Sequence, residues 1–369
     1  ITFDTAPTLG EINVNFKNYF DFVEKINLAD SSLQDQFGYS IATSNDGSQI
    51  IVGAPKADDN SSIVADSGKV YIIDRTVESF YGDGTTSVFT TDSTVLGSPV
   101  VTVDGIAKSV GTDYTFNGTD TITLGTAPNN GSIVKIESNS FVFSQTLDDF
   151  ETPQTGAQFG YSLDLCPNNC SLYIGAPYED DTTVDGGKVH RFINQGRFFG
   201  TVTGTVTNPS TSTASKILIN NFLVSFDSAD NLATIIEKIN NANIPGVTAS
   251  NVSNKLKIVT DSTIFANKLN LVLVSGSFFD DIGVKLYASQ QVISSPRDKN
   301  YNNFGKVVKV NNDANYLAVG TDQGDAKLVT VFDSGETTFD NANTVITSTV
   351  KQSGSVFLYQ FISKPNSTV

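Results

Sequence analysis

The stretch Phe37–Ile73 constrains the fold most, because the chain repeats it twice further on. It reads FGYSIATSNDGSQIIVGAPKADDNSSIVADSGKVYII, and Phe159–Phe192 repeats its Phe-Gly-Tyr-Ser, Gly-Ala-Pro and Gly-Lys-Val in the same order. A third, more divergent copy begins at Phe304 and ends with Gly354–Phe361. Such self-similarity indicates a repeat protein, in which each copy is one supersecondary unit that needs its neighbours to bury its apolar face.

Each copy carries the signature of four short strands. After Phe-Gly, residues alternate with the two-residue period of a half-buried strand. A polar turn and an apolar run follow, and the run ends at Gly-Ala-Pro because proline cannot donate to a ladder. Gly-Lys-Val begins a third strand, and another strand precedes each Phe-Gly, which predicts propeller blades. The defining residues are Phe37, Gly38, Gly53, Ala54, Pro55, Phe159, Gly160, Gly175, Ala176, Pro177, Phe304 and Gly305.

At these residues the chain resembles the FG-GAP repeat family, in the variety where Phe-Gly-Tyr-Ser, Gly-Ala-Pro and Gly-x-Val-Tyr recur. The resemblance implies a β-propeller related to the head of integrin α chains. The intervals between successive Phe-Gly pairs far exceed the ~40–50 residues of a propeller blade, so further segments must interrupt the blades.

We therefore expect a mainly β chain in which FG-GAP-type propeller blades carry a small β-sandwich and a small α+β domain as insertions. Each insertion is expected to have its own apolar core and to join its blade through two neighbouring strands. The expected boundaries are 1–16 for the end of a truncated β insertion, 17–81 for a blade, 82–139 for the β-sandwich-like insertion, 140–197 for a blade, 198–285 for the α+β insertion, and 286–369 for a blade with a short β insertion at 327–353.

The first insertion contains Asp104-Gly105 and Asn117-Gly118 between alternating runs, which predicts hairpins. Its pattern resembles a β-sandwich unit common in bacteriophage tail fibres. Ile1–Ile26 can be laid over Ile122–Leu147, with Thr-Ala-Pro aligned in both. Residue 1 is therefore expected to fall inside another copy of this unit, within a longer polypeptide, and the lack of Met agrees with that expectation.

The second insertion contains the clearest helix signal. Four apolar residues, Leu232, Ile235, Ile236 and Ile239, follow the i, i+3, i+4, i+7 spacing, and Asp227 or Ser228 is expected to cap the start of the helix. With the strands expected on either side, the segment resembles the flagellar hook IN motif, an α+β module of flagellar and phage surface proteins. The apolar stripe is expected to form the core of that module.

Charge and hydropathy exclude two classes of partner. The net charge of −16 arises from 39 acidic and 23 basic residues. Such a surface repels phosphate backbones, so nucleic acid is not an expected partner. No apolar run reaches the length of a transmembrane helix, so membrane insertion is not expected either.

Acidic residues recur in the loops after Gly-Ala-Pro, and converging carboxylates are ligands that Ca²⁺ prefers. The weak candidates are Asp58, Asp59, Asp66, Asp180, Asp181 and Asp185. Calcium-binding members of the resembled family carry D-x-D-x-D-G between the Phe-Gly and Gly-Ala-Pro strands, and this chain has Ser44–Gly47 and Cys166–Asn169 there. We therefore favour solvated turn residues and no cofactor, with calcium as the alternative.

Cys166 and Cys170 bracket a predicted hairpin turn, within reach of a disulfide. Two unreacted thiols are the alternative, and a disulfide would indicate an oxidising or extracellular setting. A metal site is not favoured, because there is no second cysteine pair and the single histidine, His190, is distant in sequence. His190 takes the strand position of Tyr71, where a surface or interstrand side chain is expected.

No catalytic constellation is present in the sequence. There is no phosphate-binding glycine loop before a helix, no histidine cluster and no nucleophile elbow, so we expect no enzymatic activity. The combined modules favour a virion structural and adhesive protein, a tail fibre or baseplate-associated appendage of a tailed bacteriophage. The alternative is a bacterial cell-surface or secreted adhesin, or an extracellular filament subunit with integrin-like repeats. Expected partners are further blades or subunits of one assembly and a host cell-surface receptor or glycan, bound multivalently.

Overall fold

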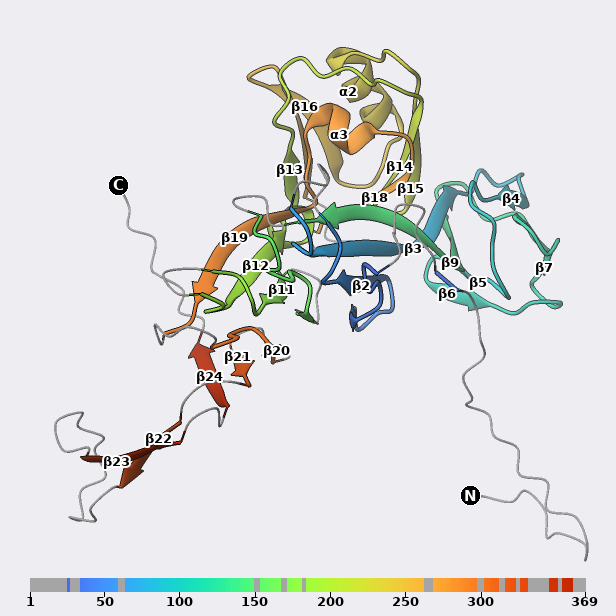
Figure 1. Ribbon diagram of the computed structural model, residues 1–369. Helices are drawn as coiled ribbons and strands as arrows, with labels where there is room; N and C mark the ends of the chain where they lie inside the picture. Colours follow the sequence, from blue (N-terminus) through green and yellow to red (C-terminus); the bar gives the residue numbers. More distant parts are fainter. Residues whose placement is uncertain are drawn as a thin grey trace, which may run out of the picture.

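The computed structural model describes residues 25–26, 34–58, 64–148, 153–166, 171–180, 184–261, 268–296, 302–311, 316–322, 326–330, 345–350 and 354–360. Its regular structure is mainly β, and the described strands include three repeat sheets in series, here called blades after the repeats that form them, which do not close into a ring (Figure 1). Two larger insertions extend from the blades. None of the described helices has the length and apolar character needed to cross a membrane.

The first blade is an antiparallel sheet in the order β1-β2-β3-β9. Its central strand β2 is buried almost throughout, as its apolar run predicts, and the polar turn Ser44–Ser48 joins it to β1. The strands are β1 (Ser40–Thr43), β2 (Gln49–Ala54), β3 (Lys69–Tyr81) and β9 (Ile133–Leu147).

The second and third blades repeat this order. The second blade pairs β10-β11-β12-β19, and the third pairs β20-β21-β24. The hairpin β22–β23 lies in sequence between β21 and β24, inside the short insertion expected at 327–353. The strands are β10 (Ser162–Leu165), β11 (Ser171–Ala176), β12 (Lys188–Asn194), β19 (Tyr287–Ser294), β20 (Val307–Val310), β21 (Tyr316–Thr321), β22 (Ala326–Thr330), β23 (Val345–Val350) and β24 (Ser355–Gln360).

Each boundary between blades lies one strand later in the sequence than expected. The strand before Phe159 (β9) pairs with β3 of the first copy, and the strand before Phe304 (β19) pairs with β12 of the second copy. The blades expected at 140–197 and 286–369 thus each begin with a strand that completes the preceding blade. The physical reason is that the insertion leaves along the third strand and returns beside it, so the returning strand bonds to that edge.

The first insertion extends the hairpin β3–β9 beyond the blade. The strands β5 and β6 continue its sheet, and a second sheet, β4-β8-β7, faces it. Between the two sheets lies a separate apolar core that includes Phe89, Val101, Tyr114, Ile122 and Val134. The strands are β4 (Val88–Thr90), β5 (Val100–Val103), β6 (Ile106–Lys108), β7 (Tyr114–Phe116) and β8 (Thr121–Leu124).

The second insertion combines two three-stranded groups with short helices, at the top of Figure 1. Leu232, Ile235 and Ile239 of α2 are buried, as the apolar stripe predicts. The helix cap differs from expectation, because Asn231 accepts hydrogen bonds from the backbone N–H of Ala233 and Thr234. The elements are α1 (Gln195–Phe199), β13 (Thr201–Thr203), β14 (Ser215–Ile219), β15 (Phe222–Phe226), α2 (Leu232–Asn241), β16 (Val247–Val252), β17 (Lys255–Thr260), β18 (Leu271–Ser275) and α3 (Phe278–Ile282).

The second insertion docks onto the extended strand β3 of the first blade. The residues Asn220 and Asn221 have φ of 48° and 74° and form a two-residue turn between β14 and β15. Their tip reaches β3, where the Ser79 N–H donates to the Asn221 carbonyl (2.7 Å) and Tyr81 stacks on Phe222 with ring centroids 4.9 Å apart.

One continuous apolar core therefore joins the second insertion to the first two blades. It contains Ile51 and Ile72 of the first blade, Ile174 of the second, and Ile217 and Ile235 of the insertion. The expectation of an independent core is wrong for this insertion. Neighbouring entry and exit strands do not prevent a hairpin tip from reaching another blade and burying apolar surface there.

Candidate functional site

The residues that define the repeat lie at the junctions between blades. Gly160 of the second copy packs against Gly53 of the first, and the Gly160 carbonyl accepts a hydrogen bond from Ser40 Oγ (2.6 Å). A Cβ placed on Gly53 would lie 2.1 Å from the Gly160 oxygen. Only a glycine at position 53 permits this approach, so Gly-Ala-Pro of one blade receives Phe-Gly of the next.

The junction between the second and third blades has the same geometry. Ser162 Oγ donates to the Gly305 carbonyl (2.7 Å), and a Cβ on Gly175 would lie 2.0 Å from the same oxygen. Phe159 and Phe304 are fully buried at the two junctions. The third residue of each copy adds to the contact, because Tyr39 packs on Tyr161 with ring centroids 4.8 Å apart.

Lys306 joins the third blade to two tyrosines of the second. Its Nζ donates to Tyr178 Oη (2.6 Å) and lies 4.8 Å from the ring centroids of both Tyr161 and Tyr178. Burial opposes the charge, but the bonds to Tyr178 and Asp322 outweigh it and raise the pKa of Lys306. A charged lysine thus takes the place that tyrosine holds in the first two copies.

The phenylalanine of each Phe-Gly packs edge-on against an aromatic ring in the third strand of its own blade. The pairs are Phe37–Tyr71, Phe159–His190 and Phe304–Phe357, with ring centroids 5.4, 5.2 and 5.6 Å apart. His190 is therefore a buried ring of the repeat, which rules out the expected surface side chain and agrees with the interstrand alternative, since its strand pairs with β11 and β19.

A buried carboxylate explains why histidine is tolerated there. Glu179 Oε2 lies 2.5 Å from His190 Nε2, and Glu179 Oε1 lies 2.8 Å from Lys188 Nζ. Burial raises the pKa of Glu179, but the bonds to His190 and Lys188 outweigh it and hold that pKa below its ordinary value. In the first copy Ala57 and Tyr71 take these two places and pack together in an apolar cluster.

The acidic loops bond to their own backbone in both blades. Asp58 Oδ1 accepts from the Asp66 N–H (3.0 Å), and Asp180 Oδ1 accepts from the Asp185 N–H (2.8 Å). Burial and the neighbouring Asp180 raise the pKa of Asp185. The described residues contain no group of three or more Asp, Glu, His or Cys side chains suited to a metal, and Asp59 and Asp181 lie outside them.

Cys170, one of the two cysteines of the predicted disulfide, also lies outside the described residues. Cys166 is buried at the end of β10, where its Sγ accepts from the Ser171 N–H (3.0 Å). The pairing of the two cysteines stays a prediction.

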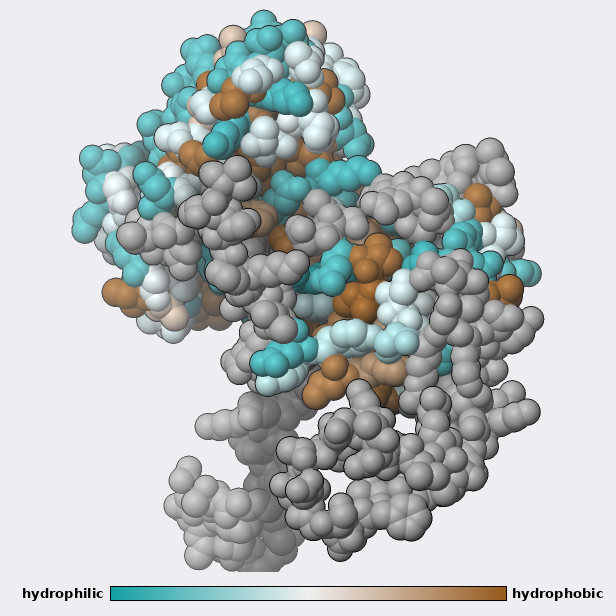
Figure 2. Space-filling view, turned by 90° about the vertical axis from the view of Figure 1, so that its left-hand side faces the viewer, coloured by the Kyte–Doolittle hydropathy of each residue, from teal (hydrophilic) through white to brown (hydrophobic). Residues whose placement is uncertain are grey.

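The outer face of the third blade has the features of a junction but no described blade against it. Gly320 occupies the repeat position at which Gly53 and Gly175 pack against a glycine carbonyl of the next blade. A groove of about 690 Å³ runs over Gly320, between Lys306 and Val356. Val307, Val356 and Leu358 are 55, 75 and 71 % exposed. In the space-filling view, hydrophilic residues dominate the second insertion at the top, and hydrophobic residues gather below it (Figure 2).

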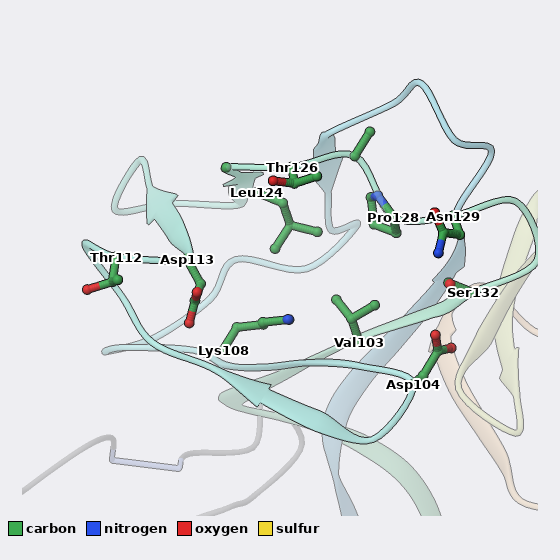
Figure 3. A pocket seen from close by; sticks show the side chains of 12 residues that line it. Val103, Asp104, Lys108, Thr112, Asp113, Leu124, Thr126, Pro128, Asn129 and Ser132 are labelled. Carbon is green, nitrogen blue, oxygen red and sulfur yellow. The ribbon is translucent and has the colours of Figure 1, made fainter.

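A cavity of about 420 Å³ opens in the first insertion, between β6 and the loop after β8 (Figure 3). The Lys108 side chain extends across it beneath Leu124, with Asp113 to one side. Asp104 and Asp113 accept hydrogen bonds from the backbone N–H groups of Ile133 and Ser109 and so shape the rim. The sequence predicted hairpins here but gave no sign of this cavity.

Comparison with known protein families identifies one repeat, in the region of the first blade. The sequence model of the FG-GAP repeat family matches residues 20–73. This stretch is thus an FG-GAP repeat, a domain of a general adhesion and binding type. No curated protein matches the chain.

Proposed function

We propose that this chain is a non-enzymatic structural and adhesive protein of a tailed-phage virion, a tail fibre or baseplate-associated appendage. The blades serve as the scaffold, and the two insertions contact a host-surface receptor or glycan, or neighbouring subunits. Two insertions held against each other along β3 would present several contacts at once, which strengthens binding without any single strong contact.

The observation that carries the proposal is the outer face of the third blade. Two junctions within the chain show what this kind of face accepts, namely the Phe-Gly of a following blade with its glycine carbonyl. Gly320 and the exposed Val356 repeat that face without a described partner. This supports incorporation into a larger assembly through a further blade or subunit.

The setting of His190 supports a non-catalytic role. Its Nε2 bonds to Glu179, its ring packs on Phe159, and its exposed fraction is 3 %. A general base must be able to reach a substrate proton. The imidazole instead packs inside the second blade, against Phe159 and Glu179.

Fractionation and labelling test the proposed location. Antibodies against the purified chain would be used on virus particles and on cell envelopes from the source of the sequence. We expect the antigen to copurify with particles and gold label to decorate their appendages. Antigen confined to cell envelopes or culture filtrate would contradict the virion assignment and favour the bacterial adhesin.

A substitution tests the role of the open face. Gly320→Val fills the groove with a branched side chain, so incorporation into particles should fall while the purified chain keeps its circular dichroism spectrum. Val292→Gln, at an exposed position on β19 of the second blade and outside both insertions, is the matched control and should be incorporated normally. Normal incorporation of Gly320→Val would show that this face is not an assembly surface.

A further inference from the structure

A second cavity, of about 270 Å³, lies where three distant segments meet. The turn before β2 provides Asp46 and Ser48, and the strands β3 and β9 provide Arg75, Lys135 and Glu137. The second insertion contributes Asn220, Asn221, Lys268 and Asn270. The cavity exists only because the tip of the β14–β15 hairpin docks on β3, beside the first blade (Figure 1).

Two residues that line this cavity each carry a buried donor without a hydrogen-bond acceptor among the described residues. The donors are Arg75 Nε and Asn220 Nδ2, and Asn220 is only 1 % exposed. The orientation of the Asn220 amide is fixed, because its Oδ1 accepts from the Asn270 N–H (2.8 Å). A buried donor without an acceptor lowers stability, so such groups in folded proteins usually have an acceptor from a ligand or an ordered water.

The charges around the cavity favour an anion. Arg75 and Lys135 both bond to Glu137, with N–O distances of 2.5 and 2.6 Å, and Asp46 accepts from Ser48. Lys268 is half-buried and forms no ion pair with any described residue. Three cations therefore face two carboxylates that already have partners, in a chain whose net charge is −16.

We propose that this cavity binds one oxyanion group, a carboxylate, sulfate or phosphate, either free or carried on an acidic sugar. The planar guanidinium of Arg75 suits two oxygens of one such group, Asn220 adds a neutral donor, and Lys268 supplies a charge that no described carboxylate neutralises. The cavity is large enough for the oxyanion group and little more than one attached sugar ring. The proposal stands independently of whether the chain belongs to a virion.

Calorimetric titration of the whole chain tests the proposal. The probes are sulfate, phosphate, acetate and glucuronate, with glucose as the neutral comparison and ionic strength held constant with chloride. We expect saturable binding of at least one anion and none of glucose. Lys268→Gln should weaken that binding about tenfold, because it removes the positive charge of one hydrogen-bond donor.

Lys257→Gln is the matched control, because Lys257 is also half-buried in the second insertion but lies outside the cavity. It should leave the affinity unchanged, and both variants should keep the unfolding temperature of the parent. Preference for sulfate or phosphate over carboxylates, or the reverse, would identify the group bound. The proposal would be overturned if no anion bound saturably, or if both variants weakened binding equally. In either case ordered water would be the partner of the buried donors.

Discussion

Replacing Gly53 by alanine tests whether the repeat glycines are the contact points between blades. The added Cβ would lie 2.1 Å from the Gly160 carbonyl oxygen and 2.2 Å from Ser40 Oγ. Both Cβ distances are far below the 3.0 Å that real Cβ atoms respect, so the second blade must move away from the first. The φ of Gly53 is one that alanine adopts freely, so steric contact alone is tested.

The expected loss follows from two contributions. Overpacking at a close contact costs about 1–3 kcal/mol, and the hydrogen bond between Ser40 and Gly160 is worth about 1 kcal/mol. We therefore expect Gly53→Ala to lower the free energy of unfolding by about 2–4 kcal/mol. Gly175→Ala should behave alike, because its Cβ would lie 2.0 Å from the Gly305 oxygen.

Urea unfolding followed by circular dichroism measures the loss, since the chain has no tryptophan. Gly320→Ala is the matched control, because the atoms nearest to a Cβ at this repeat position of the third blade all belong to Val307, the closest at 3.3 Å. It should cost less than about 1 kcal/mol. Equal losses at positions 53 and 320, or no loss at 53, would refute the assignment of these glycines to blade junctions.

Substitutions at three further positions test other contacts. Phe222→Ala should cost about 3–5 kcal/mol, because the buried ring joins the second insertion to Tyr81, and the unfolding midpoint measures this. Glu179→Gln should be less stable than the parent at pH 7, and the difference should vanish as the pH falls well below 4.5, the ordinary pKa of a glutamate. The pKa of Glu179 is lowered in the folded state, so its carboxylate stabilises the fold above pH 4.5 and loses that effect on protonation. A pH-independent difference would contradict this role. Asn221→Ala should cost about 1 kcal/mol and Asn221→Gly much less, because φ at this turn is 74°, and similar losses would argue against a strained turn.

The local structure of the blades could be read from the sequence. The alternation after Phe37, the apolar run at Ile51 and the spacing from Leu232 to Ile239 each depend on neighbours within one segment, and the corresponding strands and helix form there. The helix cap was missed because several polar residues precede Leu232. Only the backbone geometry selects Asn231 among them.

The chemistry at the junctions was only partly readable. Repetition singled out Gly53 and Phe159, but not that one copy's glycine receives the next copy's carbonyl. The same limit applies to His190, whose partner Glu179 replaces an alanine of the first copy. Arg75, Lys135 and Lys268 gave no signal at all, because they are far apart in sequence and share no motif.

A repeating, mainly β chain, its turns and the amphipathic helix at Leu232–Asn241 follow from the sequence, because those features arise from short-range periodicity and from residues that end strands. Three features depend on the tertiary structure: which copy each fourth strand completes, how the second insertion shares a core with the blades, and where the cavities lie. A strand exposes two edges and a hairpin tip can reach several surfaces. The choice among them depends on apolar area and hydrogen bonds contributed by segments more than a hundred residues apart, as with Phe222 and Ser79.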